Sequence, residues 1–247
     1  MADGWDGGIG LADGAAEEAG GARGERAIND RSQGATDGAP GLLSGSGRVE
    51  AFSDGVLAIA LTLLALDLKV PAGTPGTVVG QLLAQWPSYV AYLASFVYVG
   101  VIWVSHHALF ARISKVDSGL LWRNLVLLLP ASILPFPTAT LAYVMQHGTL
   151  GDQRAALALY GLVAAAMGAT WLLMFSYLDR RRGLLRGDVP AGFFREERRR
   201  AVLGILSPVV AVAIGLALPG AALVVFLLLP IFYAVTTEGW TPRRHHR

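Results

Sequence analysis

The feature that most constrains the fold of this chain is a series of six apolar blocks, each close to the length of a bilayer-crossing helix. A helix needs about 20 apolar residues to cross the hydrocarbon core of a membrane. The blocks are continuous runs rich in Leu, Ala and Val, whereas the strands of a membrane barrel alternate between apolar and polar residues. The sequence therefore predicts an all-α integral membrane protein with six transmembrane helices.

The proline positions add detail to this layout. Pro130, Pro135 and Pro137 should kink the third helix, because proline removes a backbone donor, and neighbouring helices can satisfy the carbonyls that it frees. Pro219 marks a tight turn between the last two spans. The expected spans cover about residues 50–70, 87–110, 122–145, 155–178, 201–218 and 220–236.

The composition is typical of a membrane protein and excludes every function that requires cysteine. Hydrophobic residues make up 53% of the 247 positions and charged residues only 15%, whereas about a quarter would be charged in a soluble domain. The chain has no cysteine, which excludes disulfides, Cys-ligated zinc and thiol catalysis.

The two ends differ in composition from the apolar region of residues 47–238. Residues 1–46 are rich in Gly, Ala and acidic residues, lack the features of a signal peptide, and predict a disordered cytoplasmic tail. Residues 239–247 form a basic tail.

The distribution of Lys and Arg predicts the orientation. Positive residues mark cytoplasmic loops, and the opposite loops hold little besides Lys69 and Arg154. Both termini should therefore face the cytoplasm, which requires an even number of spans. The cluster at 180–200 is interpreted as an orientation signal lying on anionic lipid headgroups. The residues that carry the signal are Arg112, Lys115, Arg123, Arg180, Arg181, Arg182, Arg186, Arg195, Arg198, Arg199, Arg200, Arg243, Arg244 and Arg247.

The first span, "RVEAFSDGVLAIALTLLALDL" at 48–68, carries ionisable groups at both ends. Only twelve uncharged residues separate Asp54 from Asp67, which is short for a helix exposed to lipid. Ionisable groups within a span usually face the bundle interior or a water-filled cavity. This helix is therefore expected to be a central one.

Helical geometry separates two faces of the first span. At about 100° per residue, Ser53 and Asp54 fall about 120° and 140° from Ile59. Two arrangements fit: the apolar stripe packs as ordinary core while Asp54 faces a polar cavity, or the stripe lines a pore between subunits while the polar face fixes the helix to its own bundle. Composition alone favours the first. The stripe consists of Gly55, Ile59, Thr62, Leu63 and Leu66.

Three motifs resemble those of the transmembrane protein 175 family, the potassium-permeable channels of lysosomes and prokaryotes. The pattern R-x-x-x-F-S-D at 48–54 resembles the start of the first helix of that family. "IWVSHHALF" at 102–110 and "NLVLLLPASILPFPTATL" at 124–141 resemble its second and third helices. The specific motifs lie within 48–141, while the six-span layout resembles a prokaryotic member over about 48–240.

The resemblance implies a potassium-permeable cation channel in the cell membrane, in which the first helices of four chains line one pore. It favours the second arrangement and makes residues 47–238 the channel domain. The hydrophobic constriction would be formed by Ile59, Leu63 and Leu66, and Thr62 is the candidate for ion discrimination. No T-V-G-Y-G-like loop is present for a carbonyl filter, and apolar rings can gate by dewetting.

The resemblance also implies a polar network between the first three spans. Asp67 either concentrates cations at the external mouth or is a solvated loop acid near Lys69. His106 and His107 are adjacent and diverge on a helix, which disfavours a shared metal. The expected network members are Arg48, Phe52, Ser53, Asp54, His106, His107 and Asn124.

The expected partners are potassium ions, the lipid bilayer and further copies of this chain, with no nucleic acid, metal or cofactor. No G-x-S-x-G or H-E-x-x-H motif indicates an enzyme. The alternative is a proton- or cation-coupled transporter that uses Asp54 as the carrier. The single copy of the Asp54 motif and the lack of paired broken helices count against it.

Overall fold

The computed structural model describes residues 45–70, 76–187, 189–190 and 192–236. The described residues form helices and connecting segments, with one isolated bridge between Ile113 and Leu185. The helices are α2 (Gly45–Leu66), α3 (Val78–Ala84), α4 (Trp86–Phe110), α5 (Ser118–Ile133), α6 (Pro135–His147), α7 (Leu150–Arg180), η1 (Arg182–Leu184), α8 (Phe193–Ala217) and α9 (Pro219–Thr236). The all-helical fold class is confirmed.

Five stretches within the described residues are long and apolar enough to cross a membrane. They are α2, α4, the pair α5–α6, α7 and α8. The sixth expected span corresponds to α9, an apolar helix of 18 residues that follows α8 after the turn at Leu218. The turn predicted at Pro219 is therefore confirmed.

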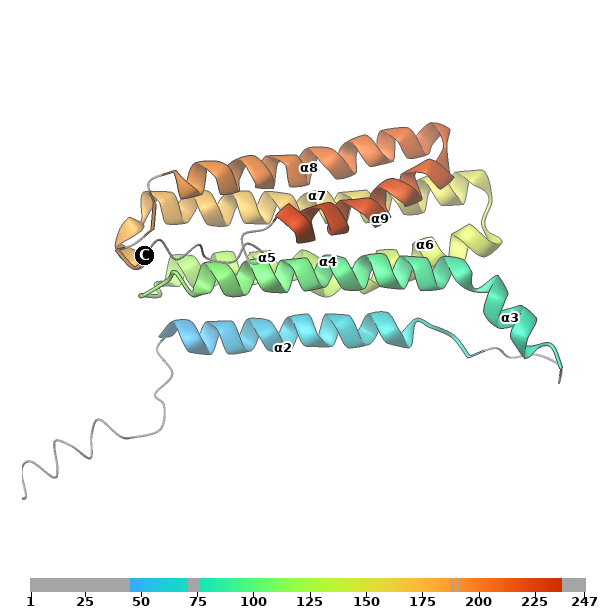
Figure 1. Ribbon diagram of the computed structural model, residues 1–247, viewed down its shortest axis with the longest axis horizontal. Coiled ribbons are helices and arrows are strands. Elements are labelled where there is room, and N and C mark those ends of the chain that lie inside the picture. The colour runs from blue at the N-terminus through green and yellow to red at the C-terminus, as the bar shows by residue number, and fades with distance from the viewer. Residues whose placement is uncertain (1–44, 71–75, 188, 191, 237–247) are drawn as a thin grey trace, which may run out of the picture. The chain divides into compact units, whose positions relative to one another are not determined.

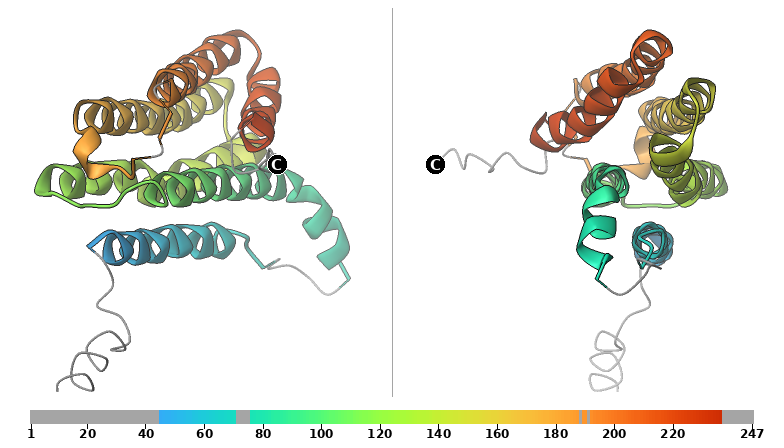
Figure 2. Two further views of the ribbon diagram at one scale, coloured as in Figure 1. Left: turned by 60° about the vertical axis from the view of Figure 1, so that its left-hand side comes forward. Right: turned by 90° about the vertical axis from the view of Figure 1, so that its right-hand side faces the viewer.

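The long helices α2 and α4–α9 pack side by side, with α2 at one margin and the short helix α3 projecting from the end of α4 (Figure 1). Among the described helices, α2 packs mainly on α4, α5 and α6, whereas α7 and α8 form the most extensive helix pair. The end-on view in Figure 2 shows α8 and α9 on the far side of α4 from α2. Within the described part of one chain, α2 is therefore a marginal helix rather than the central one that was expected, because no described helix covers its outer side.

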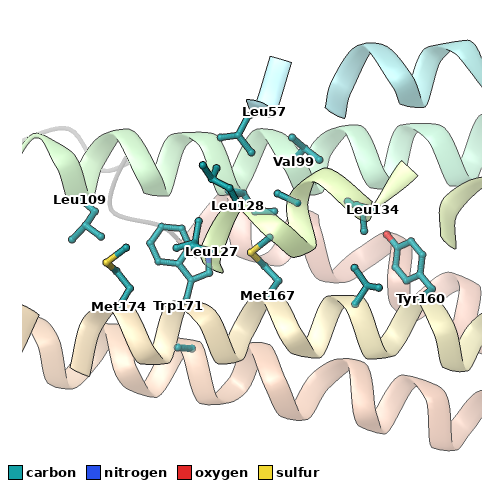
Figure 3. Close-up of a cluster of buried hydrophobic side chains, with 14 of the residues drawn as sticks. Leu57, Val99, Leu109, Leu127, Leu128, Leu134, Tyr160, Met167, Trp171 and Met174 are labelled. Carbon is teal, nitrogen blue, oxygen red and sulfur yellow. The ribbon is translucent and has the colours of Figure 1, made fainter. Parts of the chain in front are cut away.

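The core lies between α7 and the helices α4 and α5 (Figure 3). Met167, Trp171 and Met174 of α7 point toward Leu127 and Leu128 of α5 in this view. These five side chains are at most 8% exposed. The core thus joins the second, third and fourth spans into one body, onto which α2 adds Leu57.

The third span is broken between α5 and α6, as its prolines predict. α5 ends at Ile133 and α6 begins at Pro135. The hydroxyl of Thr138 donates to the Leu134 carbonyl at 2.8 Å and lies 2.8 Å from the Ser95 hydroxyl of α4. The Tyr160 hydroxyl of α7 lies 3.2 Å from Ser95. Neighbouring helices therefore hold the break, as expected where prolines interrupt the backbone bonds of a buried helix.

Several helices differ in extent from the sequence prediction, most clearly α2 and α8. The first helix was expected over 50–70 but spans Gly45–Leu66, so that Asp67 lies beyond its end. α8 was expected from residue 201 but begins at Phe193. A run of charges ends an apolar block in the sequence, yet arginine stems can continue a helix into the headgroup layer. The predicted tails, 1–46 and 239–247, lie outside the described residues except for Gly45 and Ser46.

The close pairing of α7 and α8 depends on glycine at position 168. A β-carbon at Gly168 would lie 2.7 Å from the Gly204 carbonyl carbon and 2.8 Å from the Ile205 nitrogen, both backbone atoms. A β-carbon at Gly204 would lie 3.6 Å from the nearest atom, the Gly168 α-carbon. The absence of a side chain is therefore required on α7 but not at the facing position of α8.

Gly168→Ala should lower the stability of the bundle by about 1–3 kcal/mol, because the backbones of α7 and α8 must move apart. The thermal unfolding midpoint of the purified protein in detergent measures the effect. Gly204→Ala is the matched control and should leave the midpoint nearly unchanged. Equal shifts in the two variants would contradict the close contact at Gly168.

The start of α5 is capped by Asp117, in the loop that follows α4. Its carboxylate accepts a 2.8 Å bond from the Leu120 N–H and a 2.7 Å bond from the Tyr177 hydroxyl. The Tyr177 hydroxyl and then the Leu120 N–H hold the pKa of Asp117 below its usual range. A depressed pKa stabilises the fold above the unfolded-state pKa, and this stabilisation is lost as pH falls through the folded-state value.

Asp117→Asn should therefore unfold at a lower temperature than the parent protein at neutral pH, because the charge-assisted bonds are lost. The difference should shrink as pH falls below about 4, near the ordinary pKa of aspartate. Thermal unfolding at several pH values measures it. Tyr177→Phe, which removes one of the donors, should show the same convergence, and a difference that is independent of pH would contradict this role.

Candidate functional site

The outer side of α2 carries large apolar side chains that nothing in the described chain covers. Ile59 is 60% exposed, Leu63 43% and Leu66 77%. On the opposite side, Leu57 and Leu64 are at most 1% exposed. A continuous exposed apolar stripe is typical of an interaction surface or of contact with lipid. The structure therefore brings the three predicted constriction residues together on one face, directed away from α4, α5 and α6.

Thr62 lies on the same exposed face, and its hydroxyl has a defined direction. The hydroxyl group of Thr62 donates a 2.8 Å hydrogen bond to the Ile59 carbonyl oxygen. A hydroxyl has one proton and two lone pairs. Since the proton is used within the helix, the oxygen presents only acceptor character toward its surroundings, which is the character that a cation requires.

The inner side of α2 is held by a buried hydrogen-bond chain across three helices. Asn124 of α5 donates to the Ser53 hydroxyl at 2.9 Å, and Ser53 in turn donates to the Val49 carbonyl at 2.8 Å. The Asn124 side-chain oxygen lies 2.9 Å from Nε2 of His106 on α4. All three side chains are at most 1% exposed. Ser53, Asn124 and His106 thus form the polar anchor of α2, and we use that name for these three residues below.

The anchor fixes the state of the imidazole. The Asn124 oxygen can only accept, so Nε2 of His106 carries the proton. Nδ1 of His106 is buried and has no hydrogen-bond partner in the part of the chain that the structure describes. The ring stacks on Phe110 with 4.3 Å between centroids. His106 is therefore a buried hydrogen-bond donor packed on an aromatic ring.

Two further contacts join α2 to α4 beside the anchor. Nε1 of Trp103 donates to the Asp54 carboxylate at 2.9 Å. Nδ1 of His107 lies 2.6 Å from the Glu50 carboxylate. Both pairs are more exposed than the anchor. Asp54 and His107 therefore lie beside the buried chain, each with its own partner, rather than within it.

Two residues expected in the network are not part of it. Arg48 is exposed, and the described residues provide no hydrogen bond or ion pair for its side chain. Phe52 is 55% exposed and lies on the outer face, seven residues before Ile59. The motif places Arg48 and Phe52 close to Ser53 in sequence, but their side chains point in other directions around α2 because each residue turns the helix by about 100°.

Glu50 was missed by the sequence analysis. It lies four residues before Asp54, and its partner His107 lies four residues after Trp103. Residues four apart share a helix face. Two such pairs on neighbouring helices are the signal that could have indicated Glu50.

Asp67 lies just beyond α2, at the other end from the anchor. With Lys69, Gln146 and His147, it lines an open hollow with about 1640 Å³ of empty space. Burial raises the pKa of Asp67, and the charge of Lys69 lowers it in part. Among the described residues, no three His, Asp or Glu side chains gather as a metal site.

These features define a helical membrane protein with an uncovered apolar face on its first helix and a buried polar anchor behind it. Residues 48–135 match the family described as the endosomal/lysosomal potassium channel TMEM175. The chain is 41% identical over 189 residues to a potassium channel of Streptomyces collinus, covering 76% of this chain and 91% of that protein. The chain belongs to the TMEM175 family.

Two further proteins similar to this chain also carry the TMEM175 name. A crystal structure of a lysosomal potassium-selective channel TMEM175 homolog from Chamaesiphon minutus is 31% identical, with a TM-score of 0.66, and covers 77% of this chain and 96% of that one. The endosomal/lysosomal proton channel TMEM175 of Mus musculus is 35% identical over 135 residues, which cover 50% of this chain and 27% of that protein. The family is one of ion channels rather than enzymes.

Asn124→Leu should destabilise the protein by about 1–3 kcal/mol, because His106 loses its partner and Ser53 a donor inside the bundle. Trp103→Phe is the control, since it removes a hydrogen bond that is more exposed. Thermal unfolding in detergent measures both. The anchor would be contradicted if the midpoint of Asn124→Leu fell no further than that of Trp103→Phe.

Proposed function

We propose that this protein is a potassium channel of the cell membrane, in which four copies surround one pore lined by α2. Each copy crosses the membrane six times with both termini in the cytoplasm, and the sixth crossing is α9. The family and its potassium-channel relatives support the activity. The positive residues of the loops support the orientation, because they lie on one side in the six-span layout.

The observation that carries the proposal is the uncovered stripe at Ile59, Leu63 and Leu66. In a cyclic assembly, each residue near the axis recurs at one level in every copy. The stripe therefore becomes three apolar rings along the pore. The polar anchor lies on the opposite side of α2 and keeps this face directed outward from the bundle.

The spacing of the stripe also suits a parallel bundle of α2 helices. Phe52, Ile59 and Leu66 are separated by seven residues, and all three are exposed. A period of seven keeps one seam of a helix facing its partners in a left-handed supercoil. Phe52 therefore joins the proposed pore lining, as an aromatic ring at the cytoplasmic end, instead of the polar network.

Apolar rings control conduction through the hydration of the pore. A narrow apolar constriction excludes water and gates by dewetting. Conduction then requires the rings to widen until a partly hydrated ion passes, and potassium loses its water more readily than sodium. The Thr62 oxygen lies on the stripe between Ile59 and Leu66 and offers lone pairs to the passing ion. The proposed selectivity is therefore modest rather than absolute.

The transporter alternative finds no support in the position of Asp54. The carboxylate accepts from Trp103, on the side of α2 that faces α4. This side is remote from the stripe, so Asp54 does not line the proposed ion path. Its role here is to hold α2 against α4.

Ile59→Asn should reduce the discrimination between potassium and sodium or increase the single-channel conductance, because a polar ring stays hydrated. Recording in planar bilayers with opposing potassium and sodium gradients measures both quantities. Leu57→Asn is the matched control: it lies two residues away but is fully buried, so it should destabilise the protein.

Two results would overturn the pore assignment. One is unchanged conductance and selectivity in an Ile59→Asn protein that folds and assembles normally. The other is a structure of the assembled complex in which Ile59, Leu63 and Leu66 contact lipid.

A further inference from the structure

A cavity on the far side of α4 from α2 is not used by the proposed pore. It holds about 580 Å³ of empty space, including the part open to the surroundings. Its walls come from α4, α7, α8 and α9, with no residue of α2, α5 or α6. Because this volume includes open surroundings, the feature is a groove open to the surrounding lipid rather than an enclosed pocket.

The wall of the cavity is mainly apolar and aromatic. The lining includes Ile102 of α4 and Met167, Trp171 and Phe175 of α7. It extends along α8 from Glu197 to Gly204, which corresponds to about 10 Å of helix. Gly168 and Gly204 leave part of the wall without side chains. The space is therefore long, narrow and suited to a hydrocarbon chain.

One end of the cavity carries an ion pair. Arg200 donates to the Glu197 carboxylate at 2.7 Å, and the two side chains are 35% and 16% exposed. Both residues line the cavity. Directly after Arg200, α8 becomes apolar. The charged end of the cavity thus lies where α8 passes from headgroup to hydrocarbon surroundings.

The segment around this charged end is basic. Residues 193–201 contain four arginines against two glutamates. Arg198 is paired with Asp179 of α7 and Arg200 with Glu197, while Arg195 and Arg199 are exposed. Each basic residue near an anionic membrane surface contributes about 1 kcal/mol of attraction. The charge at this end therefore complements an anionic headgroup.

We propose that this cavity binds one anionic phospholipid. One acyl chain occupies the apolar space between α4, α7 and α8, and the phosphate lies beside Arg200. The site is separate from the face of α2 that lines the proposed pore, so its occupancy does not depend on ion conduction. It stabilises the packing of α9 on α4 and α8.

Trp171 in the cavity wall provides a direct readout. The full-length protein is reconstituted in mixed vesicles of phosphatidylglycerol and phosphatidylcholine, in which one lipid carries bromine atoms in its acyl chains. Bromine quenches tryptophan fluorescence only at short range. Brominated phosphatidylglycerol should quench more than brominated phosphatidylcholine at the same mole fraction, and Trp171→Phe should remove the excess.

Two variants and a control test the two parts of the site. Arg200→Gln should weaken the preference for phosphatidylglycerol roughly fivefold, which corresponds to one lost cationic contact. Ser105→Leu keeps every charge but fills the cavity from α4, and should abolish the excess quenching. Arg199→Gln, on the same helix but outside the lining, should retain it.

Several results would overturn the proposal. Equal quenching by the two brominated lipids would show general contact with lipid, and an equal loss in Arg199→Gln would show attraction to the surface alone. Excess quenching that persists in Trp171→Phe would place the lipid elsewhere. Unchanged quenching in folded Ser105→Leu would exclude the acyl chain from the cavity.

Discussion

The structure depends on the buried contact that fixes the rotation of α2, the chain from Ser53 through Asn124 to His106. In a bilayer, apolar side chains have little preference between lipid and a protein interior, so apolar contact alone does not orient a helix strongly. Buried hydrogen bonds do, because an unpaired polar group inside the bundle costs about 1–3 kcal/mol. A turn of α2 by one residue, about 100°, would separate Ser53 from Asn124 and move Leu57 out of the core. The direction of Ile59 is thus set by polar atoms on the opposite face.

Much of this architecture follows from the sequence. Spans are visible as apolar runs, the break at Leu134 follows from Pro135 and Pro137, and the two faces of the first helix follow from its period. Periodicity does not decide whether the apolar face of the first helix packs inside one chain or lines a pore between subunits, because both arrangements give the same sequence pattern. The resemblance to the family favoured the outward direction, and the structure has the stripe exposed. Its role in a pore stays a prediction.

The remaining differences have physical causes. The spacing of four residues places Glu50 on the same face of α2 as Asp54, but its pairing with His107 also depends on how far α2 and α4 are displaced along one another, which the spacing does not specify. Phe52 was grouped with Ser53 because both belong to the R-x-x-x-F-S-D motif, but adjacent residues on a helix diverge by about 100°. The charged start of α8 ends the apolar block in the sequence, although the helix itself continues through it. In each case the sequence contains the motif or the hydropathy signal. It does not specify how neighbouring helices align, which way a side chain points or where a helix begins.

The break in the third span has a mechanical consequence. Pro135 and Pro137 contribute no N–H, so the joint at Leu134 is less stiff than a continuous helix, and bending concentrates at such points. Below the joint, α5 carries Asn124 and therefore the attachment of α2. On the other side of the joint, α6 borders the hollow beside Asp67. A tilt of α6 is absorbed at the joint, while the attachment of α2 to α5 keeps its geometry.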